Sequence, residues 1–325
     1  MSDLPEPTRN SAGFFSSAKT FSLPVGPRID PEALDGYYID LRIKAETPVW
    51  PADWFLLHER QLHVDVAQWG LGALERYLAG EGEAWLHAAL TVGEHFLDEQ
   101  EADGPQAGGW VHRFRYPHSL PLPPGWLSAM AQGQVASLLT RLHRHTGDDR
   151  FLAATAEAMR PMRIAASAGG VQALLGGSPF PEEYPTDPAS FVLNGAIFAL
   201  WGVRDAGTAL GDASLLADFD AGVDTLATNI GRWDTGYWSL YDLYPHPVLN
   251  PASSFYHALH ASQLEALLLL APRPEIAAAR HRFRAYADSP AANRRAFARK
   301  ALFRLVVPRN RLFAHRLPWT RGLAR

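Results

Sequence analysis

At 325 residues the chain is long enough for one large domain or two smaller ones, and its 47% of hydrophobic residues is typical of a globular protein. It contains no cysteine, which excludes a disulfide framework and thiolate chemistry. The net charge is only −4, and we find neither a signal peptide nor an apolar run near the ~18 residues that a membrane span needs. We therefore expect a cytoplasmic protein.

Residues 1–55 are expected to form an N-terminal arm with a short β segment. Residues 1–35 are rich in proline, serine and glycine and show weak periodicity, which favours a mobile or surface-draped arm. The stretch 37–43, YYIDLRI, alternates and contains aromatic and β-branched residues. It is therefore the best candidate for a strand in the chain.

Residues 56–289 are expected to form a catalytic domain of paired helices. The first helices of successive pairs contain the similar strings AQWGLGALERYL, AQGQVASLLTRL, LNGAIFALWGV and LHASQLEALLLL, spaced by 66, 60 and 63 residues. Helical hairpins that repeat at a near-fixed period are typical of a stacked or closed array. We therefore predict a mainly α fold, an α/α barrel of about four helical hairpins. The predicted pairs are 61–78 with 83–100, 126–145 with 150–166, 190–210 with 213–230, and 253–270 with 275–287.

Three long connections between the hairpins are expected to emerge on one rim of the barrel. They span 101–125, 169–189 and 231–252, and loops of that length in a compact domain are usually functional. They contain aromatic side chains, which stack on sugar faces, together with arginine and histidine, which bind carboxylates. This composition favours an anionic carbohydrate as the ligand.

The second of these loops ends in EEYP and leads into a helix that is apolar on nearly every side. Pro185 biases Tyr184 away from helix, so the tyrosine should lie on a loop. Asp187 and Ser190 are typical of a helix start, and the apolar run from Phe191 predicts a buried helix. The pattern predicts an acid–tyrosine cluster held by a rigid element. The alternatives are a structural tyrosine tied to a backbone carbonyl and glutamates that are simply solvated.

Four strings carry a resemblance to a known family: PGWLSAMAQGQ, EEYPTDPASFVLNG, DTGYWSLYDL and FYHALHASQLEAL. Across roughly residues 35–270 the chain resembles the C-terminal helical region of the D-glucuronyl C5-epimerases. The resemblance implies an α/α barrel preceded by β structure. It also implies that Tyr184, Tyr241 and Tyr256 are active-site residues and that the substrate is a heparan-sulfate-like glycan.

The implied activity is that of an isomerase, which inverts C5 of D-glucuronic acid residues to give the iduronate type. The C5 proton lies next to a carboxylate, so its removal needs a donor that offsets negative charge, a base on one face and an acid on the other. We predict Tyr184 and one of Tyr241 or Tyr256 as this pair, and a tyrosine base would need nearby positive charge. The candidate substrate contacts are Glu183, Asn194, Trp110, Arg113, Arg115, His257 and Gln132.

We expect no metal and no organic cofactor. His257 and His260 lie one turn apart on one helix face, but no third metal ligand follows at a convincing spacing. Two other functions stay open. A polysaccharide lyase would pass through the same carbanion and then expel the C4 substituent. A non-catalytic α/α domain would bind an anionic glycan without changing it.

The C-terminal segment differs in charge from the rest of the chain. Residues 273–325 contain 14 basic and 2 acidic residues, whereas the other 272 residues contain 16 and 32. Residues 290–325 interleave arginine with apolar side chains, a pattern that suits an anionic membrane surface or a polyanion, or else a helix packed on the barrel. The expected partner is a uronic-acid-containing oligo- or polysaccharide and not a nucleic acid. An anionic membrane surface and a homodimer stay open as further partners.

Overall fold

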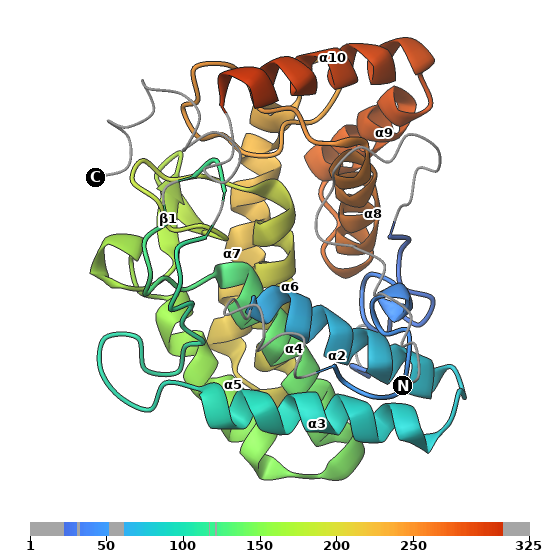
Figure 1. The fold of residues 1–325 in the computed structure, drawn as a ribbon, viewed down its shortest axis with the longest axis vertical. Helices are drawn as coiled ribbons and strands as arrows, with labels where there is room; N and C mark the ends of the chain where they lie inside the picture. Colours follow the sequence, from blue (N-terminus) through green and yellow to red (C-terminus); the bar gives the residue numbers. More distant parts are fainter. Residues whose placement is uncertain (1–22, 31–32, 52–61, 117, 121, 308–325) are drawn as a thin grey trace, which may run out of the picture.

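The computed structural model of the chain describes residues 23–30, 33–51, 62–116, 118–120 and 122–307 (Figure 1). Parts of the predicted arm and of the predicted basic tail therefore lie outside the described residues, namely 1–22, 31–32, 52–61 and 308–325. In the part that is described, the chain is mainly helical, as predicted. Helices pair in the predicted order as α2 (His63–Leu78) with α3 (Glu83–Glu99), α4 (Ala129–Thr146) with α5 (Asp149–Met162), α6 (Leu193–Leu210) with α7 (Ala213–Asn229), and α8 (Ser254–Leu270) with α9 (Pro274–Ala287).

Two of the hairpin turns share a Gly-Asp dipeptide that ends one helix and begins the next. Gly147 and Gly211 follow α4 and α6 with φ of 71° and 64°, a left-handed conformation that glycine adopts without strain. Asp148 and Asp212 then cap α5 and α7, because each side chain accepts a hydrogen bond from a backbone N–H in the first turn. The turn chemistry is local, which is why these boundaries are predicted well from sequence.

The first helices of the hairpins form an inner layer, because they pack against one another and are more fully buried than their partners. Helix α4 packs against both α2 and α6, and α6 packs against α8. The backbones of α4 and α6 touch where Gly133 faces Gly202. A Cβ added to Gly202 would lie 2.2 Å from Gly133 Cα, so the two helices approach more closely than any side chain would allow. Helix α6 is buried around nearly its whole circumference, as its apolar sequence predicts.

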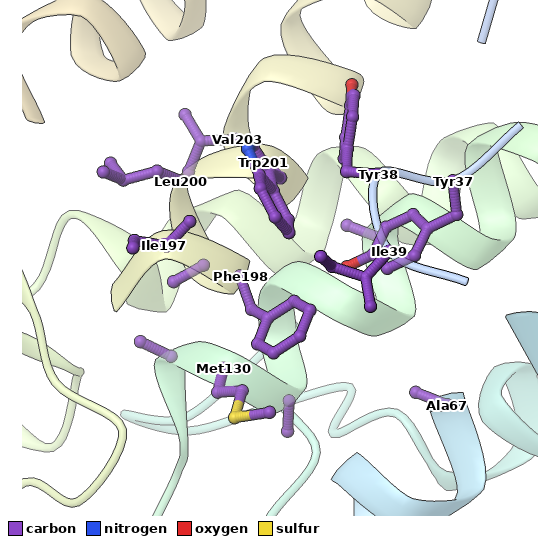
Figure 2. Packing of buried hydrophobic residues seen from close by; sticks show 14 of the residues in the cluster. Tyr37, Tyr38, Ile39, Ala67, Met130, Ile197, Phe198, Leu200, Trp201 and Val203 are labelled. Carbon is purple, nitrogen blue, oxygen red and sulfur yellow. The ribbon is translucent and has the colours of Figure 1, made fainter. Parts of the chain in front are cut away.

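The predicted strand at 37–43 is wrong. Its only β contact in the described residues is an isolated bridge between Val25 and Ile39, and residues Arg42–Lys44 form a short 3-10 helix, η1. Residues 37–39 are buried on both sides, so they insert into the core as irregular backbone. Figure 2 shows the rings of Tyr37 and Tyr38 beside Phe198 and Trp201 of α6. The alternating sequence therefore belongs to a buried irregular segment and not to a β-strand.

This N-terminal segment closes the end of the array at which α4 and α6 finish. Arg141 near the end of α4 makes a fully buried ion pair with Asp205 near the end of α6, at 2.6 Å. Tyr38 donates a hydrogen bond to the same aspartate, and Arg141 donates to the carbonyl of Gly36. Because buried charges are stable only when they are paired and hydrogen-bonded, these contacts fix the segment in place.

The long connections meet at the opposite end, where the inner helices begin. The backbone N–H of Ala129 donates to Glu182, that of Leu193 to Tyr241, and that of Leu243 to Ser190, so the three loops are tied to one another. The second loop also contains a small hairpin that was not predicted, β1 (Gln172–Leu175) and β2 (Ser178–Pro181). Helix α10 (Pro290–Val306) lies across this end (Figure 1). Within the described residues, no helix combines the length and apolar character that a membrane span requires.

Candidate active site

A second cluster of buried apolar and aromatic side chains, separate from the main core, lies where the three loops meet. Each loop contributes to it, and so does α10 through Ala296. Its buried members are Leu120, Leu122, Trp126, Tyr184, Val192, Trp238, Tyr241, Ala252 and Ala296. We refer to this group, with the half-buried Tyr116 and Tyr256 at its edge, as the rim cluster.

The three tyrosines predicted as active-site residues lie together in the rim cluster. The ring of Tyr241 is 4.9 Å from that of Tyr256, edge to face, and Tyr184 packs in the same cluster. Tyr184 lies on a loop, as predicted, with its ring stacked 4.9 Å from His118 and 5.5 Å from Tyr116. His118 and Tyr116 were not predicted as site residues. Their position next to Tyr184 depends on how the first and second loops meet, which no local pattern reveals.

Glu182 is a structural residue that shapes the loop before α6. Its carboxylate accepts hydrogen bonds from the backbone N–H and hydroxyl of Ser190, at 2.9 and 2.6 Å, and from the N–H of Phe191 at 2.9 Å. These bonds hold residues 190 and 191 outside the helix, and Phe191 has a φ of 50°. The helix start predicted near Ser190 is therefore wrong by three residues, because α6 begins at Leu193.

Glu183 points the other way, toward the tyrosines. Its side chain is buried, its charge lies close enough to Tyr184 and Tyr241 to raise the pKa of both, and its Oε2 has no hydrogen-bond partner among the described residues. Gly195 in the first turn of α6 makes room for it, since a Cβ at Gly195 would lie 2.3 Å from that oxygen. Neither glutamate is a solvated charge. Burial raises the pKa of Glu183 to about 8, and the negative charges of Glu182 and Asp242 contribute to the rise.

The hydroxyls of Tyr184 and Tyr241 are protonated at neutral pH. Burial raises the pKa of Tyr184 and of Tyr241 well above the usual value of 10, and the neighbouring charge of Glu183 raises both further. The tyrosines are therefore placed as proton donors. Of Glu183, Tyr184 and Tyr241, the carboxyl group of Glu183 is the one whose ionisation lies near neutral pH, which suits a group that takes up and returns a proton.

Three of the predicted substrate contacts are held in the interior instead. Trp110 is fully buried, and its indole N–H donates to the carbonyl of Phe96 at 2.8 Å. Gln132 is also fully buried, and its side-chain amide accepts from the N–H of Trp110 and donates to the carbonyl of Ala158. Both side chains thus satisfy main-chain groups, and neither is placed to contact a glycan.

His257 is likewise committed to the fold. Its ring stacks 3.7 Å from Trp238, Nδ1 accepts from the N–H of Ser239 at 3.1 Å, and Nε2 donates to the carbonyl of Phe283 at 2.9 Å. Burial lowers the pKa of His257 to about 4, so the ring is neutral and cannot supply a positive charge to a carboxylate.

The remaining predicted contacts are not brought to the tyrosines by any interaction seen in the described residues. Asn194 is buried beside Gly195, and its amide lies 3.9 Å from the sulfur of Met130. Arg113 is exposed and pairs with Glu101 at 2.6 Å, and Arg115 is exposed on the same loop. In the described part of the chain no group of three potential metal ligands occurs.

Comparison with known proteins was made for the whole sequence. A family model described as "D-glucuronyl C5-epimerase C-terminus" matches residues 103–285. A D-glucuronyl C5-epimerase of Caenorhabditis elegans is 35% identical over 202 residues, which are 55% of this chain and 31% of that protein. An uncharacterized protein of Methanocaldococcus jannaschii is 26% identical over 196 residues, which are 57% of this chain and 62% of that protein. The matched segments thus span less than two thirds of either relative.

Proposed function

Because the chain belongs to the D-glucuronyl C5-epimerase family, we propose that it inverts C5 of D-glucuronate residues in a uronic-acid-containing glycan. The observation that carries the proposal is the rim cluster. Glu183, a buried carboxyl group whose pKa is raised to about 8, lies next to Tyr184, one of three adjacent tyrosines, inside the matched residues 103–285. Glu182 is also buried and its pKa is raised to about 7, but its carboxylate is occupied by Ser190 and Phe191.

Inversion at C5 requires two groups that act on opposite faces of the sugar ring. We assign Glu183 to remove the C5 proton, since its carboxylate form becomes populated near neutral pH. This assignment departs from the tyrosine base predicted from the sequence, because a tyrosine with a raised pKa does not ionise near neutral pH. A tyrosine then donates its hydroxyl proton to C5 from the other face.

The donor is Tyr241 or Tyr256, whose rings are in contact with each other. Tyr184 follows Glu183 directly in the chain and packs in the same cluster as Tyr241, which suits it to position these two groups. In this scheme the C5–H bond breaks with its proton passing to Glu183, the electron pair passes into the enediolate of the carboxylate, and a new C5–H bond forms from the tyrosine hydroxyl. The tyrosinate then takes a proton from solvent and Glu183 loses one to solvent, which restores both groups. The sugar leaves with the inverted configuration. No step calls for a metal or an organic cofactor.

Incubation of the purified chain with glucuronate-containing oligosaccharides in heavy water tests the proposal. We expect deuterium at C5 in both starting sugar and product, together with formation of the inverted uronate. An unsaturated uronate that absorbs in the ultraviolet would identify a lyase instead, since elimination at C4 follows the same carbanion. Binding of the oligosaccharide with no exchange and no elimination would identify a non-catalytic glycan-binding domain.

A further inference from the structure

Helix α10 lies beyond the residues that match the family, which end at 285, yet its inner face packs on the rim cluster. The ring of Phe303 meets that of His246 edge to face at 4.9 Å, and Ala296 is one of the buried members of the cluster. The guanidinium group of Arg295 lies 3.9 Å above the ring of Tyr237. Three contacts along the helix thus fix it over the third loop.

Lys300 is the residue of α10 that approaches the tyrosines. Its Nζ lies 5.7 Å from the ring centre of Tyr241 and 5.2 Å from that of Phe303. It donates a hydrogen bond to Oδ1 of Asn250 at 2.7 Å, and Nδ2 of Asn250 in turn donates to Asp242 at 2.7 Å. Asn250 and Asp242 are both buried, so the position of the ammonium group is determined by a fixed network, not by a mobile surface side chain.

A positive charge near Tyr241 would stabilise the negative charge that the proposed reaction brings to the rim cluster. The reaction proposed above brings a carboxylate next to Glu183 and then adds further negative charge as the enediolate forms. Lys300 lies over the ring of Tyr241, one of the three predicted active-site tyrosines. Arg113 is exposed and paired with Glu101, and His257 is neutral.

We propose that Lys300 is a substrate-binding residue that receives the carboxylate of the uronate sugar and so selects acidic over neutral sugars. The proposal rests on the proposed function for its substrate class. It assigns part of the binding site to a helix outside the family match. Lys300 is half-buried, as are Tyr244 and Tyr256, which pack at the edge of the rim cluster.

The test compares Lys300→Met, Lys300→Arg and the control Arg299→Met. Lys300→Met removes the charge and keeps the apolar stem that covers Phe303, whereas Arg299→Met removes an equal charge from an exposed neighbour on the same helix. Binding is measured by calorimetry with a glucuronate oligosaccharide and with the same oligosaccharide after its carboxyl groups are reduced to alcohols. C5 exchange in heavy water is measured on the acidic oligosaccharide.

For Lys300→Met we expect ~10- to 100-fold weaker binding of the acidic oligosaccharide, the usual weight of a charge-assisted hydrogen bond, with unchanged binding of the reduced one. Lys300→Arg should regain part of the loss, and Arg299→Met should behave like wild type. Unchanged binding of the reduced sugar also shows that the variant is folded.

The outcomes separate this proposal from the proposed function. If Lys300→Met binds and exchanges like wild type, Lys300 does not receive the carboxylate of the sugar, although the epimerase proposal stands. If wild type exchanges no C5 hydrogen but still prefers the acidic sugar through Lys300, the site is confirmed and the epimerase proposal fails. If wild type binds both oligosaccharides equally, the Lys300 proposal is overturned.

Discussion

Glu182 and Glu183 are adjacent residues of the same type, but their carboxyl groups lie in different surroundings. Glu182 accepts three short hydrogen bonds from Ser190 and Phe191 and holds the loop, whereas Glu183 faces Tyr184 with one oxygen unpartnered among the described residues. An unpartnered buried polar atom is costly, so native structures retain one where function requires it. Burial of Glu183 therefore lowers the stability of the fold, which is the cost expected if the proposed role in proton transfer is correct.

The raised pKa of Glu183 makes the free energy of unfolding depend on pH. The pKa of Glu183 is about 8 in the folded chain against a usual 4.5, so the folded state keeps a proton that the unfolded chain loses. The free energy of unfolding must then fall as pH rises from 4.5 to about 8, by on the order of a few kcal/mol, and stay level above that. Urea denaturation at pH 5 and pH 9 should show this loss in wild type and a smaller one in Glu183→Gln. The exposed control Glu157→Gln should match wild type, and an equal loss in Glu183→Gln would contradict the assignment.

The same ionisation should appear in the kinetics. If Glu183 removes the C5 proton, its carboxylate form is the active one, and kcat/KM reports the ionisation of the free enzyme. Activity per unit substrate should therefore rise with pH up to about 8 and then level off. C5 exchange measured from pH 5 to pH 9 checks this, and a rate that falls across the interval would assign Glu183 as the acid.

The tyrosines differ in what removal of each hydroxyl should cost. Tyr184→Phe, Tyr241→Phe and Tyr256→Phe each delete one oxygen from an aromatic cluster and should leave the helices folded. The variant that lacks the proton donor should lose inversion by ~10²- to 10⁴-fold, the usual weight of general acid catalysis. It should keep some C5 exchange, because Glu183 still serves one face. Deuterium incorporation and inversion are measured separately, and full inversion in all three variants would remove the tyrosines from the mechanism.

At the level of helices, the α4–α6 contact shows how closely the inner layer is packed. Gly202 and Gly133 meet backbone to backbone, and a Cβ on Gly202 would lie 2.2 Å from the main chain of Gly133. Gly202→Ala must push the two helices apart and should lower the free energy of unfolding by roughly 1–3 kcal/mol, despite the better helix propensity of alanine. Thermal unfolding measures the loss. Gly231→Ala is the matched control, since nothing lies within 4 Å of its added Cβ.

The helices could be predicted from sequence because their causes are local. Apolar periodicity predicts all four hairpins, and the Gly147-Asp148 and Gly211-Asp212 turns mark where the two helices of the second and third hairpins meet. The start of α6 could not be predicted, because Glu182 accepts hydrogen bonds from the N–H groups of residues 190 and 191, which lie eight and nine residues further along the chain. The strand at 37–43 failed for a related reason, since what holds Tyr38 is a buried aspartate 167 residues away in sequence.

The site was only partly predictable for the same reason. Tyr184, Tyr241 and Tyr256 are identified by strings that resemble a family, whereas residue type alone assigned Trp110 and Gln132 to the sugar. Their burial is a property of the packed hairpins, not of the loop sequence. Lys300 was noted only as one charge in a basic tail. Its place beside Tyr241 depends on the contact between α10 and the third loop.

At the scale of the whole molecule, helix α10 has one face that packs on the rim cluster and one face that is exposed. Its inner face holds Lys300 and Phe303 on the rim cluster. Its outer face exposes apolar side chains, with Phe297 59% and Leu305 77% exposed, next to Arg294 and Arg299. Exposed apolar side chains beside arginines suit an anionic membrane surface, where the first enter the lipid boundary and the second meet the headgroups. A soluble polyanion would use only the arginines.

We therefore predict that the chain binds vesicles containing anionic phospholipid, more weakly as salt is raised, and binds neutral vesicles much less. Truncation after Ser289 is not a clean test, because it also removes Phe303 and Lys300 from the rim cluster. The double variant Phe297→Ser/Leu305→Ser leaves those contacts in place and should weaken vesicle binding at all salt concentrations. Leu174→Ser, an exposed apolar residue on β1, is the control. If the double variant binds vesicles like wild type while Arg294→Gln/Arg299→Gln loses binding to both vesicles and long acidic glycans, the outer face recognises polyanions and not a membrane.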